Sequence, residues 1–435
     1  MKTDVVIVGC GVAGLFCALQ IPEDKKIVIL TKASAEECDS FLAQGGICVL
    51  KDEADYDSYF EDTMRAGHYE NRKESVDLML RDSRTIIDEL IAFGVDFQRD
   101  EDGNLMFTRE GGHSTARILF HEDETGKEIT SRLLAQVRKR KNIVLLEHTT
   151  MVDLLVKEQT CYGVAAKKED GSVETYEGQV TMLATGGIGG IYEHSTNFSH
   201  LTGDSLALAL KYGIELEHID YVQIHPTTLY TEKEGRSFLI SESVRGEGAL
   251  LYNTKKERFV DELLPRDVVT AAIYEQMEKD HMPYVWLDMS PLGEEELKNH
   301  FPNIYKKCIE EGYDVRTDMI PVVPSQHYFM GGIHVDRNSK TSMNRLYAAG
   351  ETSCNGVHGK NRLASNSLLE SLVFAKRAAL HMKRLLEMEA FISYDGNVDT
   401  SSYEDMEQWS RKNKEAVWKE IEREKQENES DYNES

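Results

Sequence analysis

The sequence predicts an α/β fold in which a Rossmann-like dinucleotide-binding domain is interrupted by a second, inserted domain. Three observations support this fold class: a strand, glycine turn and helix at the N-terminus, a change of composition between residues 219 and 325, and a return of glycine-rich segments after residue 325. A chain of 435 residues is long enough for two or three domains with large cores.

The N-terminal unit begins with the β-branched run 5–8, which leads directly into Gly-x-Gly-x-x-Gly at Gly9, Gly11 and Gly14 and then into an apolar helix-forming segment, 15–19. Gly9 permits the tight turn, Gly11 lets the backbone approach a pyrophosphate, and Gly14 lets helix and strand pack closely. The phosphates would lie at the positive end of the helix. This placement predicts dinucleotide binding, with an ordinary strand-to-helix turn as the alternative.

A second strand, 27–30, completes a β-α-β unit. The acidic residue that binds the ribose of NAD is expected about 20 residues after the turn, but Lys32 stands there instead. This departure argues against plain NAD binding and leaves NADP as an alternative that the rest of the chain does not favour.

The loop 39–47 is small and polar and contains the pair Gly45 and Gly46. Such a loop suits close approach of the backbone to a flat ring, although an ordinary turn has the same composition. Residues 56–93 have the apolar spacing of two amphipathic helices.

Residues 143–185 alternate as strands do, with turns expected at 169–171 and 177–178, and end in glycines as the first strand does. Asp204 follows Gly203 at the start of an apolar helix, where it could equally serve only as the N-cap.

The segment 219–325 contains seven of the eight prolines and is predicted to be an inserted domain. Glycine-rich segments return at 331–333 and 346–351, and a long helix is predicted at about 367–388. The chain is hydrophilic from residue 389 onward, with a short apolar stripe formed by Trp409, Val417, Trp418 and Ile421.

Composition excludes several classes of function. The net charge of −26 argues against a nucleic-acid partner, which needs a positive surface, but a locally basic pocket for a small anion remains compatible with it.

No apolar run reaches the roughly 20 residues that cross a bilayer, so we expect no membrane association. Seven cysteines without a CxxC pair indicate reduced thiols and a cytoplasmic protein. No cluster has metal-ligand spacing, and we expect no metal.

The inserted domain and its edges supply cations and imidazoles. Each alone is compatible with a structural role; Arg266, for example, could merely pair with Asp267. Together they suggest an anion site, because guanidinium groups bind carboxylates through paired hydrogen bonds. The candidate residues are His225, Arg245, Arg266, His327 and Arg362.

An ordered series of motifs resembles one flavoprotein superfamily, that of succinate dehydrogenase, fumarate reductase and L-aspartate oxidase. The series, over residues 3–385, is GCGVAG, FLAQGGI, TREGGHSTARI, LATGG, TGDSLALAL, QIHPTTLY, SESVRGEGA, PRDVV, SQHYFMGGI, AAGE and HGKNRLASNSLLE. The L-aspartate oxidase family is the best match. This resemblance implies a Rossmann-like FAD-binding domain (1–218 and 326–388), an α+β capping domain (219–325) and a short helical C-terminal segment (389–435), which replaces a longer helical domain of the relatives.

The resemblance implies oxidation of L-aspartate to iminoaspartate, with oxygen or fumarate as acceptor, in NAD biosynthesis through quinolinate. The alternatives are a soluble fumarate reductase or succinate dehydrogenase flavoprotein and, less favoured, a noncatalytic flavin-bound subunit. The expected ligands and partners are a small dicarboxylate and a possible coupling to quinolinate synthase.

The resemblance implies that Glu110, in TREGGHS, faces the amino group of the substrate. A carboxylate at about 4 Å from an ammonium gains about 4 kcal/mol at an effective dielectric constant of about 20, and it repels succinate. We therefore expect Glu110 to select aspartate; the alternative is a carboxylate that is solvated or paired with an arginine.

The flavin is expected to be noncovalent, because Asp39 stands where membrane-bound succinate dehydrogenases carry the histidine that bonds to FAD. Relatives also carry lysine at the position of Lys32, which explains the missing ribose carboxylate. By resemblance, the FAD contacts are Gly9, Gly11, Val12, Ala13, Gly14, Lys32, Ser40, Gln44, Gly45, Gly46, Met151, Asp204, Glu351, Ser367 and Leu368.

The resemblance also implies the roles of the polar residues. Arg266 corresponds to the proton donor and acceptor, which requires a pocket that lowers the pKa of a guanidinium, and Glu242 and Arg245 correspond to a proton relay that leads to it. The residues that would bind the substrate carboxylates are His225, Ser241, His327 and Arg362, with serine at 241 where relatives usually have threonine.

Overall fold

The computed structural model describes residues 1–233 and 235–434. Its main sheet has seven strands in the order β5-β2-β1-β8-β7-β6, with β16 paired to β8. Parallel pairing joins β5, β2, β1, β8 and β16, whereas β6 and β7 are antiparallel additions. The strands are β1 (Lys2–Val8), β2 (Ile27–Leu30), β5 (Ile143–Leu146), β6 (Thr149–Lys157), β7 (Thr160–Lys168), β8 (Val173–Leu183) and β16 (Leu346–Ala348).

The main sheet is buried on both faces, as a parallel sheet requires. Along β1, Val5 and Ile7 belong to a core cluster with helices on one face, whereas Val6 and Val8 belong to a second cluster on the other face. The helices of the first face are α1 (Val12–Gln20), α4 (Lys73–Ala92), α5 (Thr125–Lys139) and α11 (Asn366–Met388), and the second face is covered by α6 (Asp204–Tyr212) with β6 and β7.

One expected turn in this region is wrong. The strands and the turn at 169–171 are confirmed, but residues 177–178 lie inside β8. At this point β8 changes partners, from β7 along its first half to β1 and β16 along its second. A Cβ on Gly178 would lie 2.9 Å from Val6 Cγ2, so the glycine serves close packing of two strands.

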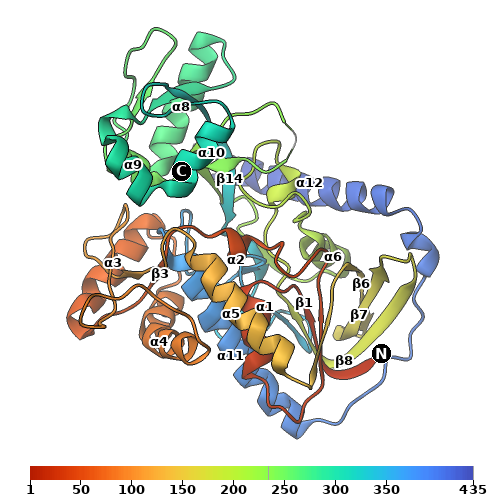
Figure 1. Ribbon diagram of the computed structural model, residues 1–435. Coiled ribbons are helices and arrows are strands. Elements are labelled where there is room, and N and C mark those ends of the chain that lie inside the picture. Colours follow the sequence, from red (N-terminus) through yellow and green to blue (C-terminus); the bar gives the residue numbers. More distant parts are fainter. Residues whose placement is uncertain (234, 435) are drawn as a thin grey trace.

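A second, antiparallel sheet with the order β11-β10-β14-β13-β12 carries its own core. It forms the upper lobe in Figure 1, where α8, α9 and α10 lie beside β14. Its elements are β10 (Val222–Leu229), β11 (Phe238–Leu239), α7 (Glu242–Gly246), β12 (Leu250–Tyr252), α8 (Arg266–Asp280), β13 (Val285–Asp288), α9 (Glu294–His300), α10 (Pro302–Glu310) and β14 (Ile320–Phe329). The chain enters through β10 and returns through β14, and the boundaries at 218/219, 325/326 and 388/389 stay predictions.

Short elements complete the lower lobe. They are the pair β3 (Ile47–Cys48) and β4 (Ile118–Leu119), the sheet of β9 (Leu216–Glu217), β15 (Gly332–His334) and β17 (Ser353–Cys354), and the helices α2 (Asp39–Leu42) and α3 (Tyr56–Ala66). Helices α3 and α4 confirm the two helices that were predicted for residues 56–93, and α11 confirms the long helix near the end of the flavoprotein-like region.

The C-terminal segment contains one long helix, α12 (Met406–Glu434), which packs on α6. Val417 and Ile421 are fully buried in the second core cluster, whereas Trp409 belongs to a separate cluster near Tyr403. Trp418 is 38% exposed and contacts Tyr192 edge-on. The predicted apolar stripe is therefore correct for Val417 and Ile421 and wrong as one continuous face.

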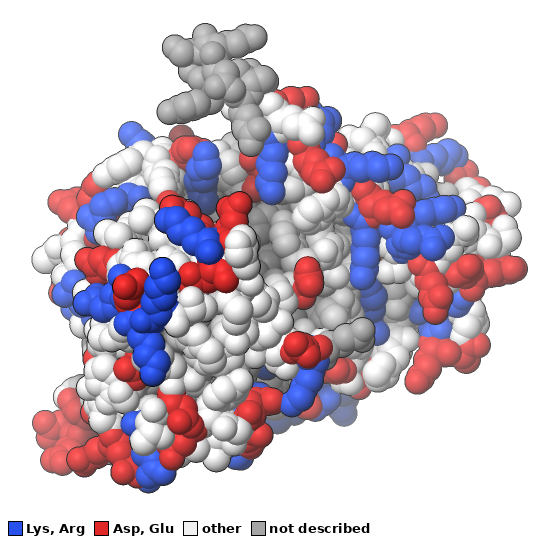
Figure 2. All heavy atoms as spheres, turned by 90° about the horizontal axis from the view of Figure 1, so that it is seen from above, with Lys and Arg blue, Asp and Glu red and all other residues white. Residues whose placement is uncertain are grey.

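The surface is mixed in charge. Lys and Arg are interspersed with Asp and Glu over the face drawn in Figure 2, so the excess of acidic residues does not gather there into one patch. None of the described helices combines the length and the apolar character needed to cross a bilayer. All seven cysteines are free thiols.

Candidate functional site

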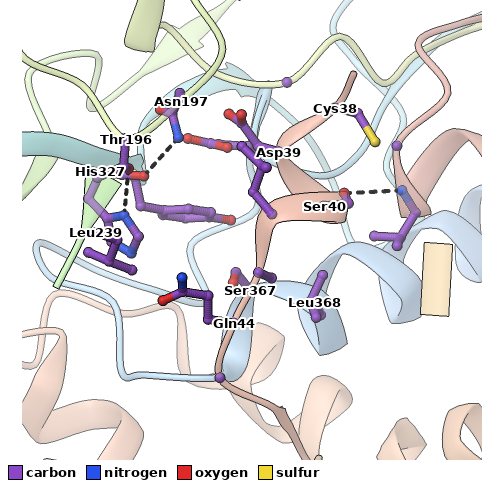
Figure 3. Close-up of a pocket in the computed structure, with 18 of the residues that line it drawn as sticks. Cys38, Asp39, Ser40, Gln44, Thr196, Asn197, Leu239, His327, Ser367 and Leu368 are labelled. Carbon is purple, nitrogen blue, oxygen red and sulfur yellow. Dashed lines mark hydrogen bonds between the residues drawn. The ribbon is translucent and has the colours of Figure 1, made fainter. Parts of the chain in front are cut away.

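A cavity of about 1020 Å³ lies between the two lobes. This volume is at the upper end of the roughly 300–1,000 Å³ of ordinary small-molecule pockets, as a large cofactor plus a substrate would require. The cavity is lined by every residue that the sequence predicted for the site except Gly14 and Arg245. Figure 3 shows side chains from several distant segments, among them Asp39, Gln44, His327 and Leu368, around this space.

One end of the cavity is formed by the N-terminus of α1. Gly11 is the N-cap of α1 and has no side chain to cap the helix, so the N–H groups of the first turn are left for other partners. Val12 N donates to Ser40 Oγ at 3.2 Å (Figure 3), and the remaining N–H groups of the first turn are open to a ligand. A Cβ on Gly9 would lie 2.0 Å from the Ala184 carbonyl oxygen, and one on Gly14 would lie 2.1 Å from that of Gly9. Gly9 thus permits the tight turn, Gly11 lets the backbone approach a ligand, and Gly14 lets the helix pack against the strand, as in pyrophosphate-binding sites of this motif.

Lys32 and Asp204 meet beside this helix end. Lys32 Nζ lies 2.9 Å from Asp204 Oδ2 and also donates to Thr202 Oγ1. Asp204 is the first residue of α6, and the N-cap is Gly203 at φ 70°, so the N-cap role considered for Asp204 is wrong. Its carboxylate is instead held at the cavity wall by a lysine 172 residues earlier in the chain.

Asp39 and Glu351 bring two carboxyl groups to the middle of the cavity. Asp39 Oδ1 accepts from Phe198 N at 3.0 Å, and its buried Oδ2 has no hydrogen-bond partner among the described residues. Burial raises the pKa of Asp39 above its ordinary value, and burial followed by the nearby Asp39 raises the pKa of Glu351 in the same way. An orphaned acceptor, an open helix end and glycine walls fit the ribityl and pyrophosphate groups of FAD, and a carboxylate at position 39 offers no imidazole for a covalent bond.

The pair Gly45 and Gly46 is required by the protein itself. A Cβ on Gly45 would lie 2.6 Å from Glu110 Oε1, and one on Gly46 would lie 2.3 Å from the Leu119 carbonyl oxygen. At Gly46 the contact is with the backbone of β4, so no side chain fits there, whereas a side chain at Gly45 would displace the Glu110 carboxylate. Both glycines line the cavity, as expected for a loop that contacts a flat ring.

Two guanidinium groups, Arg266 and Arg362, converge on one amide oxygen. Gln223 Oε1 accepts from Arg266 NH1 at 3.0 Å and from Arg362 NH2 at 3.2 Å. Arg362 also stacks on the Tyr328 ring at 4.7 Å, and its Nε has no partner among the described residues. Burial, followed by the nearby Arg266, lowers the pKa of Arg362 to about 10, so it remains a cation at neutral pH.

Two histidines complete the anion pocket. The rings of His225 and His327 are 5.4 Å apart, and His327 Nδ1 lies 2.8 Å from Thr196 Oγ1 (Figure 3). Burial, followed by the neighbouring arginines, lowers the pKa of both well below the ordinary value for histidine. Both are therefore neutral at pH 7 and can act only through hydrogen bonds.

Arg266 and Glu242 form an ion pair at the start of α8 and α7. The Asp267 partner considered for Arg266 is wrong, because Asp267 points elsewhere and lies 3.9 Å from His68. Burial alone would raise the pKa of Glu242, but Arg266 and Arg245 lower it below the ordinary value, so Glu242 is ionised.

Arg245 lies behind this pair rather than in the cavity wall. Its NH1 donates to the Glu262 carbonyl at 2.7 Å, and its Nε and NH2 have no hydrogen-bond partner among the described residues. The described structure contains no hydrogen bond between Arg245 and Glu242. In the predicted relay, Arg266 and Glu242 are thus joined by an ion pair, whereas Arg245 acts on Glu242 only through its charge.

Ser241 lies at the cavity wall and caps α7, with its Oγ accepting from Ser243 N at 3.2 Å. The hydroxyl proton of Ser241 points at Ser243 Oγ, 3.3 Å away, and rotation of the hydroxyl would turn it to a ligand carboxylate, so the capping role is compatible with the predicted one.

Glu110 faces the same pocket from the lower lobe. Its Oε2 accepts from Ser365 Oγ at 2.6 Å, and the described structure contains no salt bridge from it to an arginine. Burial, followed by repulsion from Glu242, raises its pKa, although Ser365, Arg266 and Arg362 oppose this. Pairing with an arginine, the alternative role for Glu110, is therefore absent from the described contacts.

The sequence reasoning did not assign Gln223 or Ser365 to the site. Both lie inside motifs that carried the resemblance, QIHPTTLY and HGKNRLASNSLLE, but neither is charged. Only their spatial position between charged groups identifies them.

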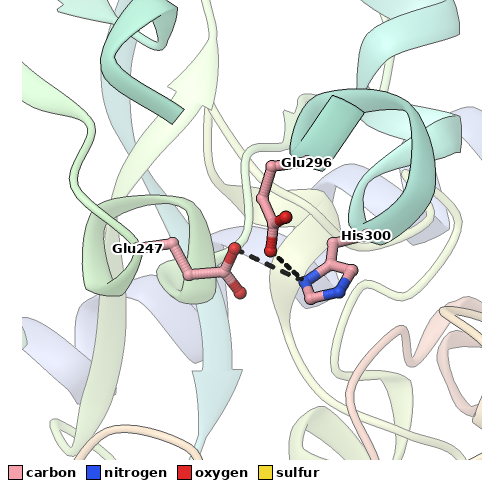
Figure 4. Close-up of side chains that lie close together, drawn as sticks. All are labelled: Glu247, Glu296 and His300. Carbon is pink, nitrogen blue, oxygen red and sulfur yellow. Dashed lines mark ion pairs between the residues drawn. The ribbon is translucent and has the colours of Figure 1, made fainter. Parts of the chain in front are cut away.

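One group of side chains outside this arrangement has metal-ligand character. Glu247, Glu296 and His300 offer ligand atoms within 4.8 Å of one another near the cavity mouth, and no other such group occurs among the described residues (Figure 4). His300 Nδ1 lies 2.9 Å from Glu296 Oε1 and 3.6 Å from Glu247 Oε2. The imidazole of His300 thus lies between two carboxylates, all three side chains contact solvent, and the absence of a metal stays a prediction here.

Comparisons with known proteins agree with this geometry. Residues 4–368 match the family described as FAD binding domain. An L-aspartate oxidase of Clostridium perfringens is 50% identical over 385 residues, which cover 88% of this chain and 87% of the relative. One from Pseudomonas aeruginosa is 40% identical, over 93% of this chain and 79% of its own length. A solved quinol-fumarate reductase with menaquinol molecules has a TM-score of 0.84 at 29% identity, covering 98% of this chain and 75% of that one. The chain belongs to the L-aspartate oxidase family of FAD-binding flavoproteins.

Proposed function

We propose that this protein is an FAD-dependent L-aspartate oxidase that converts L-aspartate to iminoaspartate. One observation carries the choice of substrate: Glu110 forms no salt bridge among the described residues, and it faces a pocket whose other charged walls include Arg362 and Arg266, the latter paired with Glu242. Cations match the two carboxylates of the substrate, and an anion matches its ammonium group. Succinate would find the same cations but only repulsion at Glu110.

The side chains of this chain hold and orient the substrate. Arg362 and the neutral imidazoles of His225 and His327 bind the carboxylates with Ser241, while Glu110 takes the ammonium end. This two-ended hold converts a random encounter into one oriented complex. FAD, when bound in this cavity, would supply the acceptor for the hydride of Cα.

The proton that leaves the substrate passes to the pair of Arg266 and Glu242. Glu242 is the group that can store it, because its carboxylate is ionised and hydrogen-bonded to Arg266. Arg245 contributes positive charge that keeps Glu242 ionised until the proton arrives. In this proposal Arg266 is the proton donor and acceptor, and Arg245 acts through Glu242.

Anaerobic titration of the yellow holoprotein tests this function against the alternative, a fumarate reductase or succinate dehydrogenase flavoprotein. The structural likeness to quinol-fumarate reductase supports that alternative. We expect L-aspartate to bleach the flavin absorbance stoichiometrically and succinate to leave it oxidised. Bleaching by succinate but not by aspartate would reverse the assignment.

The FAD is expected to be released by acid, because Asp39 replaces the histidine that would bond to it. Precipitation with trichloroacetic acid should leave a colourless pellet and a yellow supernatant, measured by absorbance and fluorescence of both fractions. A pellet that retains flavin after washing would contradict the noncovalent assignment.

The proposal extends to the cellular context. The proposed electron acceptor is oxygen or fumarate, and the proposed fate of the product is NAD biosynthesis through quinolinate synthase, to which this protein would be functionally coupled. Free thiols at all seven cysteines are typical of a reducing compartment, which supports a cytoplasmic location.

A further inference from the structure

The helix N-cap Ser365 has an unusual geometry. It precedes α11 at φ 60° and ψ 8°, in the left-handed region that few residues other than glycine adopt. A serine at an N-cap usually accepts a hydrogen bond from the first turn, but Ser365 makes no such cap. The residue is 7% exposed, so water neither replaces the missing cap hydrogen bond nor offsets the cost of the left-handed backbone. Strained positions of this kind gather at functional sites.

The Ser365 hydroxyl is used elsewhere. Its Oγ accepts from Gly46 N at 3.1 Å and donates to Glu110 Oε2 at 2.6 Å. The amide can only donate, so the hydroxyl proton is left for Glu110. A donor at this distance stabilises the ionised carboxylate, and the same oxygen ties Glu110 to the glycine loop that lines the FAD cavity.

The backbone of Ser365 is held by a buried network. Its carbonyl accepts from Cys48 N at 3.1 Å, and the preceding Ala364 carbonyl lies 3.0 Å from His113 Nε2. Arg117 NH1 lies 3.0 Å from His113 Nδ1, which makes Nδ1 the acceptor and Nε2 the donor to Ala364. Burial lowers the pKa of His113 to about 4, so this neutral tautomer persists at pH 7.

Arg117 anchors the other end of the network. It is fully buried and forms salt bridges with Asp55 at 2.9 Å and Asp62 at 2.7 Å. Asp62 Oδ2 also accepts from Ser114 N, four residues after Glu110. The loop that carries Glu110 and the turn that carries Ser365 therefore share one buried anchor.

We propose that Ser365 is a positioning residue for substrate selection: its hydroxyl orients the Glu110 carboxylate and keeps it ionised to receive the substrate ammonium. This inference rests on the proposed role of Glu110. The other charged or titratable groups that face Glu110 are Arg266 on α8, Glu242 on α7, Arg362 on the loop before α11 and Cys48 on β3.

The test uses Ser365→Ala and Ser365→Gly holoproteins. Both remove the hydroxyl, but glycine adopts the left-handed backbone freely, whereas alanine keeps the steric cost of the Cβ that serine also has. The matched control is Ser339→Ala: Ser339 also has φ 60°, is fully buried, and donates to the Phe374 carbonyl at 3.1 Å, but does not line the cavity.

The readouts are the pH profile of kcat/KM for L-aspartate and the Kd of succinate, followed by flavin absorbance. Glu110 must be ionised, so activity falls on the acidic side of its pKa, and removal of a donor to the ionised form raises that pKa. In both Ser365 variants the pH below which kcat/KM for L-aspartate falls should rise by about one unit. At pH values below that point kcat/KM should be about tenfold lower than in the wild type, and at high pH it should recover. The loss should appear mainly in KM, and succinate should bind no more weakly than to the wild type.

Three outcomes overturn the proposal. An unshifted acidic limb in both variants shows that the hydroxyl does not hold Glu110 ionised. Recovery in Ser365→Gly but not in Ser365→Ala assigns the effect to backbone strain alone. An equal shift in Ser339→Ala makes the effect nonspecific. Glu110→Gln distinguishes failure of the Ser365 proposal from failure of the proposed function. If Glu110→Gln alters discrimination between aspartate and succinate while the Ser365 variants do not, the role of Ser365 fails and the proposed function stands.

Discussion

Arg266→Leu is expected to abolish turnover with L-aspartate while FAD stays bound. Positioned proton transfer typically contributes 10²–10⁴-fold to a rate, and this substitution removes the proposed donor and one of the cations of the pocket, so we expect kcat to fall by about a thousandfold or more. FAD should remain bound, because Arg266 is not among the proposed FAD contacts. Steady-state oxidation of aspartate and the flavin-to-protein absorbance ratio measure the two effects.

Arg316→Leu is the matched control for this substitution. Arg316 lies in the same lobe, is 41% exposed and pairs with Asp314 and Glu294 away from the cavity. Its loss should leave kcat within twofold of the wild type, in line with the small energies of surface ion pairs. An active Arg266→Leu enzyme would remove Arg266 from the proton path. Loss of activity together with loss of FAD would instead mean that the residue supports the fold of the site.

Glu110→Gln is expected to lower kcat/KM for L-aspartate by about a thousandfold. A carboxylate at about 4 Å from an ammonium contributes about 4 kcal/mol at an effective dielectric constant of about 20, and 1.36 kcal/mol corresponds to a factor of ten. Glutamine keeps the shape and one oxygen for Ser365 but not the charge. Succinate should bind more tightly to the variant, because the repulsion is removed, and its Kd follows from the flavin spectrum.

Glu101→Gln, an exposed acid nine residues earlier in the chain, is the control and should behave as the wild type. The opposite response of the two ligands is the decisive result. If aspartate and succinate weaken in parallel in Glu110→Gln, the carboxylate acts on the shape of the pocket and not on the charge of the substrate amine.

The fold and much of the cavity wall were predictable from local patterns. The glycine turn lies where the apolar pattern of strand β1 changes to that of helix α1. Helices α3, α4 and α11 follow from apolar spacing within single segments. The turn expected at 177–178 and the N-cap role of Asp204 were wrong for a tertiary reason. In both cases a neighbouring segment, β1 or Lys32, decides the conformation or the contacts.

The sequence by itself determined the family, the cofactor class and which charged side chains are available, because these follow from residue types at short spacings and from ordered motifs. Only the tertiary structure decided which of them interact. Arg266 meets Glu242, 24 residues away, instead of its neighbour Asp267, and the Glu110 carboxylate meets a serine 255 residues away. Gln223 and Ser365 carry no charge, so their importance arises from what burial places against them. Burial in the cavity opposes the charged forms of Glu110 and Arg362, and the groups that tertiary structure places beside Glu110, among them Ser365 and Arg266, oppose this effect.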